Sequence, residues 1–507
     1  MKNQLVWKSL FTFITICEAL LLISSFFLFY TCPDHAEHLF SSWLIWNGEV
    51  PYRDFFEHHN PLLWYLLAPI VGLMVNNALI LYVSRVLCGL MWGVIFWGLY
   101  RLGRDFLKLN KTCFGVALCC YFAFLDSYYI FWELRPDFLM LGCFIWGLYF
   151  GCRFLKMQKQ RDLTLCFGLF AISFLFLQKV LVLLIPILGY GLYLLMKKRI
   201  TMVQIGWACL PAGGVILLFF GYLYAENAIN IYWLLNFDLN AQVMKLHGIN
   251  NLSVYAYWLP IAGLFGLRYF LKENNPYRNL LVIIWIWDIV SKGIFGASYV
   301  HYFIFSNLIA GMIFSHFIVN HLEKKIALLV LICYFLVACD GIRNIRSNRN
   351  FYAYYQMHKM IMAESNSGQP LINGVYTFIN LYGKRTGYYW FGYGDVAPVA
   401  QFLYGIDRQP DIEQMIVTYK PKFEVYQPYP NLIYQKQITS EKLRSRQEEH
   451  LKNMVREIAL KHELGADETE KFVTYMAKPF FYGFNPYYQY YGSLIKTPFD
   501  VLVKRGD

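Results

Sequence analysis

Long apolar stretches separated by short polar linkers dominate the chain up to about residue 341. A helix needs about 17 to 25 mostly apolar residues to cross the hydrocarbon core of a bilayer, and a helix enclosed by others can be shorter. We therefore expect an α-helical polytopic membrane protein with about 11 transmembrane helices. The predicted segments are 9–30, 78–100, 112–125, 137–152, 163–177, 179–196, 203–223, 252–271, 279–291, 301–320 and 326–340.

Basic residues in the linkers predict how the chain is oriented. They cluster at the N-terminus and in alternate linkers, and such an excess is typical of the cytoplasmic side. The N-terminus is therefore predicted to be cytoplasmic, and the first loop and everything after residue 341 to face outward. The first apolar segment exceeds a signal-peptide h-region and no small-x-small cleavage site follows it, so it should remain as an anchor. The clusters are Lys2 and Lys8; Arg101, Arg104, Lys108 and Lys111; Arg153, Lys156, Lys159 and Arg161; Lys197, Lys198 and Arg199; Arg268, Lys272 and Arg278; Lys324 and Lys325.

Composition agrees with this interpretation. A content of 57% hydrophobic and 15% charged residues is too apolar for a soluble chain of 507 residues. The net charge of +12 resides largely in the linker clusters, so it indicates membrane orientation and not nucleic-acid binding. Most cysteines lie inside apolar runs, so the sequence predicts no disulfide framework. It contains no Gly-rich phosphate loop, HExxH motif or CxxC pair.

The first loop, residues 31–61, is dense in Asp, Glu, His and Arg. Asp34 and Glu37 have the spacing of a capping box, which predicts a short amphipathic helix that begins at Asp34 and stops near Gly48. Asn60 is predicted to cap a second short helix, with Pro61 at its first position. Both helices, within residues 34–75, are expected to lie at the membrane interface, and the second could instead be re-entrant.

Beyond residue 342 the chain is polar and rich in Tyr. We predict two domains: a transmembrane bundle, 1–341, and a soluble extracytoplasmic α/β domain, 342–507. Strands are expected at 371–383 and 420–429, and helices at 412–419 and 440–477. The aromatic segment 481–494 could stack on sugars, or its tyrosines could pack a small core or rest on lipid headgroups.

Ionisable residues near apolar segments are candidate site residues, because they are costly at membrane depth. They include Glu133, Arg135 and Asp137 in FWELRPD, and Lys179 in FLQKV. The first loop also holds enough ligands for a divalent cation, although histidines at a headgroup boundary are commonly hydrogen-bonded surface groups; we assign no metal ligands. These potential ligands are His35, His38, His58, His59, Asp34, Glu37 and Glu57.

These residues resemble the GT-C membrane glycosyltransferases, which take sugars from polyprenyl phosphates and include protein O-mannosyltransferases and the aminoarabinose transferase acting on lipid A. The resemblance rests on Asp34 with Glu37 nearby, on GEVPYRDFFEHHNPLLWYLLAP, on Arg85, and on the RPD motif at Arg135. It implies transfer of a sugar to a lipid, glycan or protein acceptor on the outer face of a plasma (inner) membrane. Many members carry a contiguous Asp-Glu pair, whereas His35 follows Asp34 here.

The resemblance also implies roles for particular residues. In an inverting transfer a carboxylate deprotonates the acceptor hydroxyl while cations stabilise the departing lipid phosphate. Asp34 is the candidate general base, with Glu37 beside it. Candidate donor-phosphate ligands are Arg85, Arg135, Lys179 and Arg53, and candidate substrate-binding residues are Asp54, His58, His59, Glu133 and Asp137.

Structural explanations also account for several of these residues. Asp34 could only cap its helix, and Arg135 and Asp137 could only pair across a turn. Arg85 and Lys179 could extend to the headgroups. A transporter or flippase of lipid-linked sugars would have similar intramembrane charges, but we find no internal duplication. A non-catalytic assembly subunit is a third hypothesis, and it predicts that Asp34→Asn leaves function intact.

Overall fold

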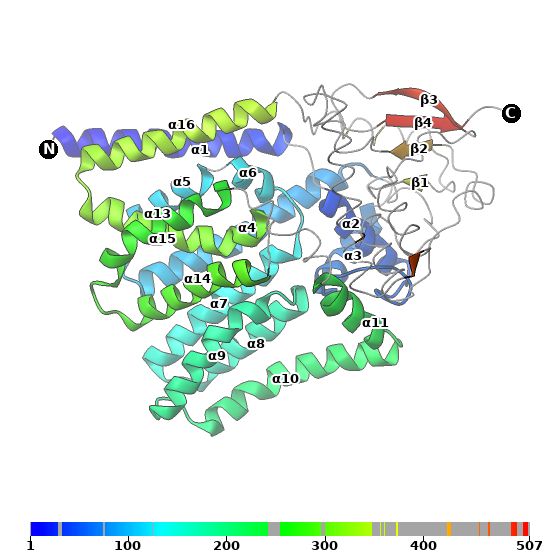
Figure 1. Ribbon diagram of the computed structural model, residues 1–507, viewed down its shortest axis with the longest axis horizontal. Helices are drawn as coiled ribbons and strands as arrows, with labels where there is room; N and C mark the ends of the chain where they lie inside the picture. Colours follow the sequence, from blue (N-terminus) through cyan, green and yellow to red (C-terminus); the bar gives the residue numbers. More distant parts are fainter. Residues whose placement is uncertain are drawn as a thin grey trace.

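The computed structural model describes residues 2–28, 33–74, 77–123, 125–241, 254–295 and 300–346, with four short strands and a few single residues further on. Its helices form a bundle with the N-terminus at one end and α2 and α3 at the other (Figure 1). The helices are α1 (Lys2–Leu28), α2 (Pro33–Trp46), α3 (Leu62–Met74), α4 (Ile80–Asp105), α5 (Lys111–Phe122), α6 (Leu125–Phe131), α7 (Pro136–Met157), α8 (Gln160–Phe176), α9 (Val180–Met196), α10 (Met202–Ala225), α11 (Ile229–Trp233), η1 (Leu234–Leu239), α13 (Val254–Leu271), α14 (Pro276–Phe295), η3 (Val300–Phe303), α15 (Ile304–His321) and α16 (Lys324–Arg346).

Each predicted apolar segment coincides with a helix of this bundle. Helix ends follow local chemistry. Asn110 caps α5, accepting the Cys113 N–H at 2.8 Å, and Thr201 and Gln204 form a reciprocal capping box at the start of α10. The apolar pattern did not predict the short elements α6, α11 and η1, because a helix of five to seven residues is too short to show a periodic pattern.

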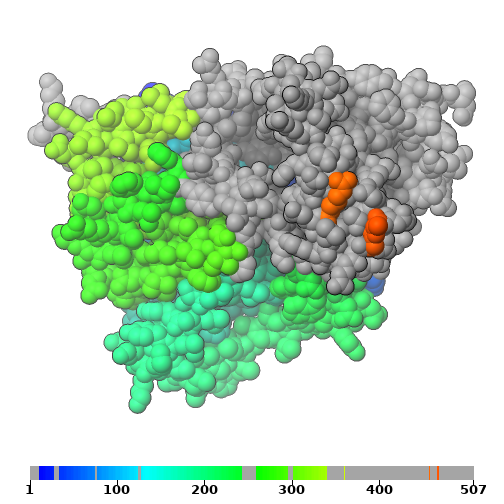
Figure 2. Space-filling view, viewed as in Figure 1, coloured from blue at the N-terminus to red at the C-terminus, as the bar shows by residue number. Residues whose placement is uncertain are grey.

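By length and composition, four of the described helices could cross a membrane: Ile80–Asp105, Pro136–Met157, Met202–Ala225 and His301–His321. Shorter apolar helices accompany them. Large apolar side chains on the outer helix faces are exposed, among them Leu218 of α10 at 75% and Leu329 of α16 at 61%. Figure 2 shows the broad outer surface that α10 and α13 to α16 form. The molecule is a helical membrane protein, and the number of crossings stays a prediction.

Close helix packing holds the bundle together. Gly266 of α13 faces the backbone of α15, where an added Cβ would lie 2.8 Å from the Ile313 carbonyl oxygen. Arg278 is fully buried and donates to the carbonyl oxygens of Leu107 and Phe270. These hydrogen bonds join the start of α14 to the segment after α4 and to α13. Arg278 belongs to one of the basic clusters in the linkers, and its guanidinium satisfies buried carbonyl groups there.

The first loop forms two helices, α2 and α3, that pack against each other. The predicted capping box is wrong: α2 begins at Pro33, so Asp34 lies inside its first turn. The expected stop near Gly48 is confirmed, since α2 ends at Trp46 and Gly48 has a φ of +88°. Asn60 precedes α3, but its side-chain amide joins the Phe174 carbonyl and the Tyr232 hydroxyl, because tertiary partners replace the expected cap.

Four strands are described beyond residue 346: β1 (Ile372–Asn373), β2 (Phe423–Tyr426), β3 (Tyr488–Ser493) and β4 (Asp500–Lys504). They form one sheet in the order β1-β2-β4-β3, in which β1 and β2 are parallel and the other pairs antiparallel. β1 and β2 fall inside the two segments expected to contain strands. The helices expected at 412–419 and 440–477 lie, apart from single residues, outside the described residues, so the α/β domain stays a prediction.

Candidate active site

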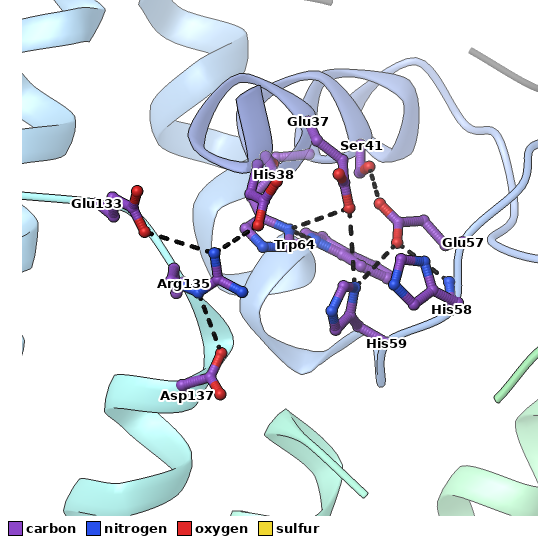
Figure 3. A network of polar contacts seen from close by, with 12 residues as sticks. Glu37, His38, Ser41, Glu57, His58, His59, Trp64, Glu133, Arg135 and Asp137 are labelled. Carbon is purple, nitrogen blue, oxygen red and sulfur yellow. Dashed lines mark hydrogen bonds and ion pairs between the residues drawn. The ribbon is translucent and has the colours of Figure 1, made fainter. Parts of the chain in front are cut away.

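Polar side chains converge where the first loop meets the ends of α7, α9 and η3. Arg135 lies at the centre (Figure 3). It has extended backbone angles directly before α7, and Pro136 occupies the first turn of that helix. A residue before proline favours an extended backbone, so Arg135 stays outside α7. The FWELRPD motif therefore places a cation at the mouth of the bundle.

The guanidinium of Arg135 contacts three carboxylates and one imidazole. It is ion-paired with Asp34, and lies 3.4 Å from both Glu133 and Asp137. It also donates to His301 Nε2 at 2.9 Å, so that nitrogen is an acceptor and the imidazole is neutral. Because the Arg135 side chain is only 4% exposed, these contacts substitute for water around a buried charge.

Lys179 supplies a second cation from the turn between α8 and α9. Its Nζ lies 3.8 Å from Asp137 and 3.8 Å from the centroid of the Tyr302 ring. Asp137 thus links Lys179 to Arg135. The interpretation of Lys179 as a cation that only extends to the headgroups does not account for these two contacts.

Asp34 is the most accessible carboxylate of this group, with 37% of its side chain exposed. Partial enclosure acts to raise the pKa of Asp34, but the charge of Arg135 and its hydrogen bond to the carboxylate outweigh it, so the pKa lies below its ordinary value of 3.8. Asp34 is therefore ionised at neutral pH, and it is open enough to meet a substrate.

The first two histidines of the loop are held by hydrogen bonds. His35 Nδ1 accepts the Leu134 N–H at 2.9 Å, and its Nε2 lies 2.6 Å from the Ser84 hydroxyl. His38 Nδ1 accepts from Trp64 Nε1 at 3.0 Å, which joins α2 to α3. Both imidazoles are therefore hydrogen-bonded, as expected for histidines that bind no metal. They are buried, whereas a position at the surface was expected.

A second group lies deeper, between α2 and the segment before α3. It contains Glu37, Glu57, His58 and His59. Burial raises the pKa of Glu57 to about 8, and burial together with the neighbouring Glu57 carboxyl raises the pKa of Glu37 well above its ordinary value. Burial and the charge of Lys179 lower the pKa of His58 to about 3, so this imidazole is neutral.

Three of the predicted site residues have described contacts with partners other than Arg135. Arg85 of α4 is buried, and its guanidinium donates to the Phe26 carbonyl oxygen of α1 and faces the Phe26 ring. Arg53 is exposed and pairs with Asp54 at 2.7 Å and with Glu226 at 2.5 Å. These described contacts connect Arg85 to α1, and Arg53 to Asp54 and to the residue that follows α10.

Sequence reasoning missed several residues of the site, namely His301, Tyr302, Ser41 and Trp64. His301 and Tyr302 come from η3, far along the chain from the first loop. The signal in the sequence that could have identified His301 is its position at the end of the linker 292–301, between two apolar segments. Ser41 and Trp64 lie on helix faces that look apolar or neutral in sequence, so only their tertiary contacts single them out.

Part of the chain matches a described protein family. Residues 55–224 match the family model described as dolichyl-phosphate-mannose-protein mannosyltransferase. The matched range includes Arg135, Asp137 and Lys179 but begins after Asp34. No curated protein matches the sequence.

Among solved structures, the fold is similar to that of ArnT from Cupriavidus metallidurans, crystallised with undecaprenyl phosphate. The TM-score is 0.50 at 10% sequence identity, over 85% of this chain and 95% of ArnT. At this identity the likeness concerns the fold. The two matches confirm the resemblance to the GT-C superfamily of membrane glycosyltransferases.

Proposed function

We propose that the protein transfers a sugar from a polyprenyl-phosphate donor to a lipid, glycan or protein acceptor on the extracytoplasmic face of a plasma (inner) membrane. The matched family and the fold shared with ArnT support glycosyl transfer in a membrane. The observation that carries the proposal is the ion pair between Asp34 and Arg135, together with Asp137, which contacts both Arg135 and Lys179. A base and two cations are the parts that such a transfer needs.

In this proposal Asp34 is the general base of an inverting reaction. The acceptor oxygen forms a bond to the anomeric carbon as the bond from that carbon to the phosphate oxygen breaks. The acceptor proton passes to Asp34, and the polyprenyl phosphate leaves with the electron pair. Arg135 and Lys179 hold the phosphate, and the planar guanidinium suits two parallel hydrogen bonds to its oxygens.

The ion pair between Asp34 and Arg135 gives the donor a further effect on the base. A carboxylate paired with a guanidinium is a weak base, because the cation stabilises the ionised form. A donor phosphate that binds Arg135 shares this positive charge, so the pKa of Asp34 should rise when the donor is bound. Donor binding would therefore activate the base.

The test uses the purified full-length protein with undecaprenyl phosphate carrying a radiolabelled sugar, in a panel of sugars and acceptor extracts. Label should move to an acceptor, and Asp34→Asn should abolish transfer without loss of folding. Asp54→Asn is the matched control, because Asp54 is also in the first loop but pairs with Arg53, and it should retain transfer. Full activity of Asp34→Asn would refute the role of Asp34, and movement of the donor across a bilayer without transfer would indicate a flippase.

A further inference from the structure

The deeper group of the first loop has the composition and spacing of a metal site. Each of Glu37, Glu57, His58 and His59 offers one ligand atom, and these atoms all lie within 4.8 Å of one another. Glu37 comes from α2, and the other three residues are consecutive in the segment before α3 (Figure 3). The set spans two elements that a hydrogen bond from Ser41 of α2 to Glu57 also joins.

The distances within the group fit coordination better than hydrogen bonding. His59 Nδ1 lies 3.4 Å from Glu57 Oε2 and 3.7 Å from Glu37 Oε1, so it approaches both carboxylates without a short bond to either. Two ligands on a tetrahedral zinc ion, each about 2.0 to 2.2 Å from the metal, are roughly 3.4 Å apart. The distances from His59 Nδ1 to the two carboxylate oxygens are thus close to that spacing between ligands.

Two buried carboxyl groups of this group lie close together, and either protons or a cation must compensate their charge. Glu57 is fully buried and Glu37 is 8% exposed. Among the described residues neither carboxylate has an ion pair with Lys or Arg, and Glu37 Oε1 is a buried oxygen without a hydrogen bond. Two adjacent buried carboxylates are costly unless protons or a cation compensate them.

Neighbouring groups orient these candidate ligands. The Ser41 hydroxyl donates to Glu57 Oε1 at 2.6 Å, which leaves Oε2 directed at His59. The hydrogen bond to Oε1 therefore fixes the orientation of the Glu57 carboxylate, as is usual for residues that bind metals. A donor set of two imidazoles and two carboxylates suits Zn²⁺ and similar divalent transition ions, whereas Ca²⁺ and Mg²⁺ prefer oxygen ligands alone.

We propose that Glu37, Glu57, His58 and His59 bind one divalent transition-metal ion of the Zn²⁺ class, which joins α2 to the segment before α3. Asp34 lies one helical turn before Glu37, so the ion would fix the helix that presents Asp34 to the membrane surface. The role is structural and makes no use of the transfer reaction. Metal content and thermal stability therefore test it independently of the proposed function.

The experiment measures metal in the full-length protein purified in detergent, stripped with a chelator and dialysed against Zn²⁺, Mn²⁺ or Mg²⁺. Elemental analysis should find one Zn²⁺ per chain, and Zn²⁺ should raise Tm by several degrees while Mg²⁺ does not. Glu57→Gln and His59→Gln should each lose the ion and the shift in Tm. His316→Gln is the matched control, because His316 is a buried imidazole of α15 outside the group, and it should retain both.

Particular results would overturn the proposal. Wild-type protein without bound Zn²⁺ and with an unchanged Tm would refute the site, and retention of the ion in both variants would place it elsewhere. An equal response to Mg²⁺ would refute the choice of metal class. If the variants do not fold, the Co²⁺-loaded wild-type protein decides, because four-coordinate nitrogen and oxygen ligation gives intense visible absorption and six-coordinate ligation does not.

Discussion

Arg135 is the residue on which the polar site most depends. Its guanidinium is almost fully buried and touches Asp34, Glu133 and Asp137. A buried ion pair contributes little net stability when complete, but removal of one partner leaves charges that nothing compensates. Loss of Arg135 would leave three carboxylates without their cation, so the cost of its removal should be large. Arg135 should therefore be indispensable for folding as well as for function.

Replacement of Arg135 by alanine should therefore destabilise the protein by about 3 to 5 kcal/mol. Arg53→Ala is the matched control: Arg53 also pairs with two acids, but its side chain is 41% exposed and the loss should be within about 1 kcal/mol. Unfolding of both variants in detergent, followed by tryptophan fluorescence, measures the difference. Equal stability of the two variants would show that the buried cluster does not hold the first loop.

The pH dependence of transfer follows from the lowered pKa of Asp34. A general base must be unprotonated, and the kcat/KM profile reports the pKa of the free enzyme. Because Arg135 keeps the pKa of Asp34 below 3.8, the base stays ionised and kcat/KM should not fall between pH 8 and pH 5. Burial lowers the pKa of His38 and of His58 to about 3. Protonation of these two imidazoles should therefore not change kcat/KM near pH 6.5.

Initial rates between pH 5 and pH 8 test this expectation on protein whose folding is checked at each pH. The same network makes Asp34 a stabilising group in the folded state. That contribution is present above the unfolded pKa and is lost as pH falls through the lower folded pKa. A decline in kcat/KM centred near pH 6.5, with the protein still folded, would assign the essential base to a different group.

Among the elements, α13 and α15 are in close contact. In membranes small residues let helix backbones approach each other, and Gly266 serves this purpose against Ile313. An added methyl group would meet a carbonyl oxygen of a rigid helix, which cannot rotate aside as a flexible side chain can. The packing of these two helices is therefore sensitive to a single carbon atom.

Gly266→Ala should consequently destabilise the bundle by about 1 to 3 kcal/mol. Gly214→Ala is the control, because Gly214 lies in α10 with open space around its Cβ position, and this change should be neutral or stabilise by up to about 1 kcal/mol. Thermal unfolding in detergent distinguishes the two substitutions. A loss of the same size at both positions would attribute the effect to helix propensity or lipid contact and not to packing.

At the scale of the whole molecule, the alternation of basic clusters predicts a cytoplasmic N-terminus and an outward first loop. The side chains that converge on Arg135 come from the first loop and from linkers assigned to the same side. This agreement supports the orientation, because a single site must open to a single compartment. The domain after residue 341 is proposed to share that compartment.

Cysteine labelling tests the orientation. An impermeant thiol reagent should label Arg53→Cys in intact cells, since Arg53 is exposed in the first loop. Lys197→Cys, in a basic linker, should react only after the membrane is opened. The unsubstituted protein gives the background from its own cysteines. Labelling of Lys197→Cys in intact cells would reverse the predicted topology.

The sequence alone determined which segments are helical, because apolar runs long enough for a bilayer leave few alternatives to a helix. It also singled out Asp34, Arg135, Asp137 and Lys179, since charges beside apolar segments stand out by composition. It could not determine which charges meet. Arg85 and Arg53 look equivalent to Arg135 in sequence, and only the positions of α1 and α10 direct them to other partners.

Tertiary structure decided the site because its members come from distant parts of the chain. His301 contacts Arg135 across more than 160 residues, and no local pattern specifies such a contact. The helix start at Pro33 and the side-chain contacts of Asn60 differ from expectation for the same reason: a buried partner outweighs a local cap. Hydrophobic length is a property of each segment and can be read locally, whereas the pairing of buried charges depends on how the helices pack.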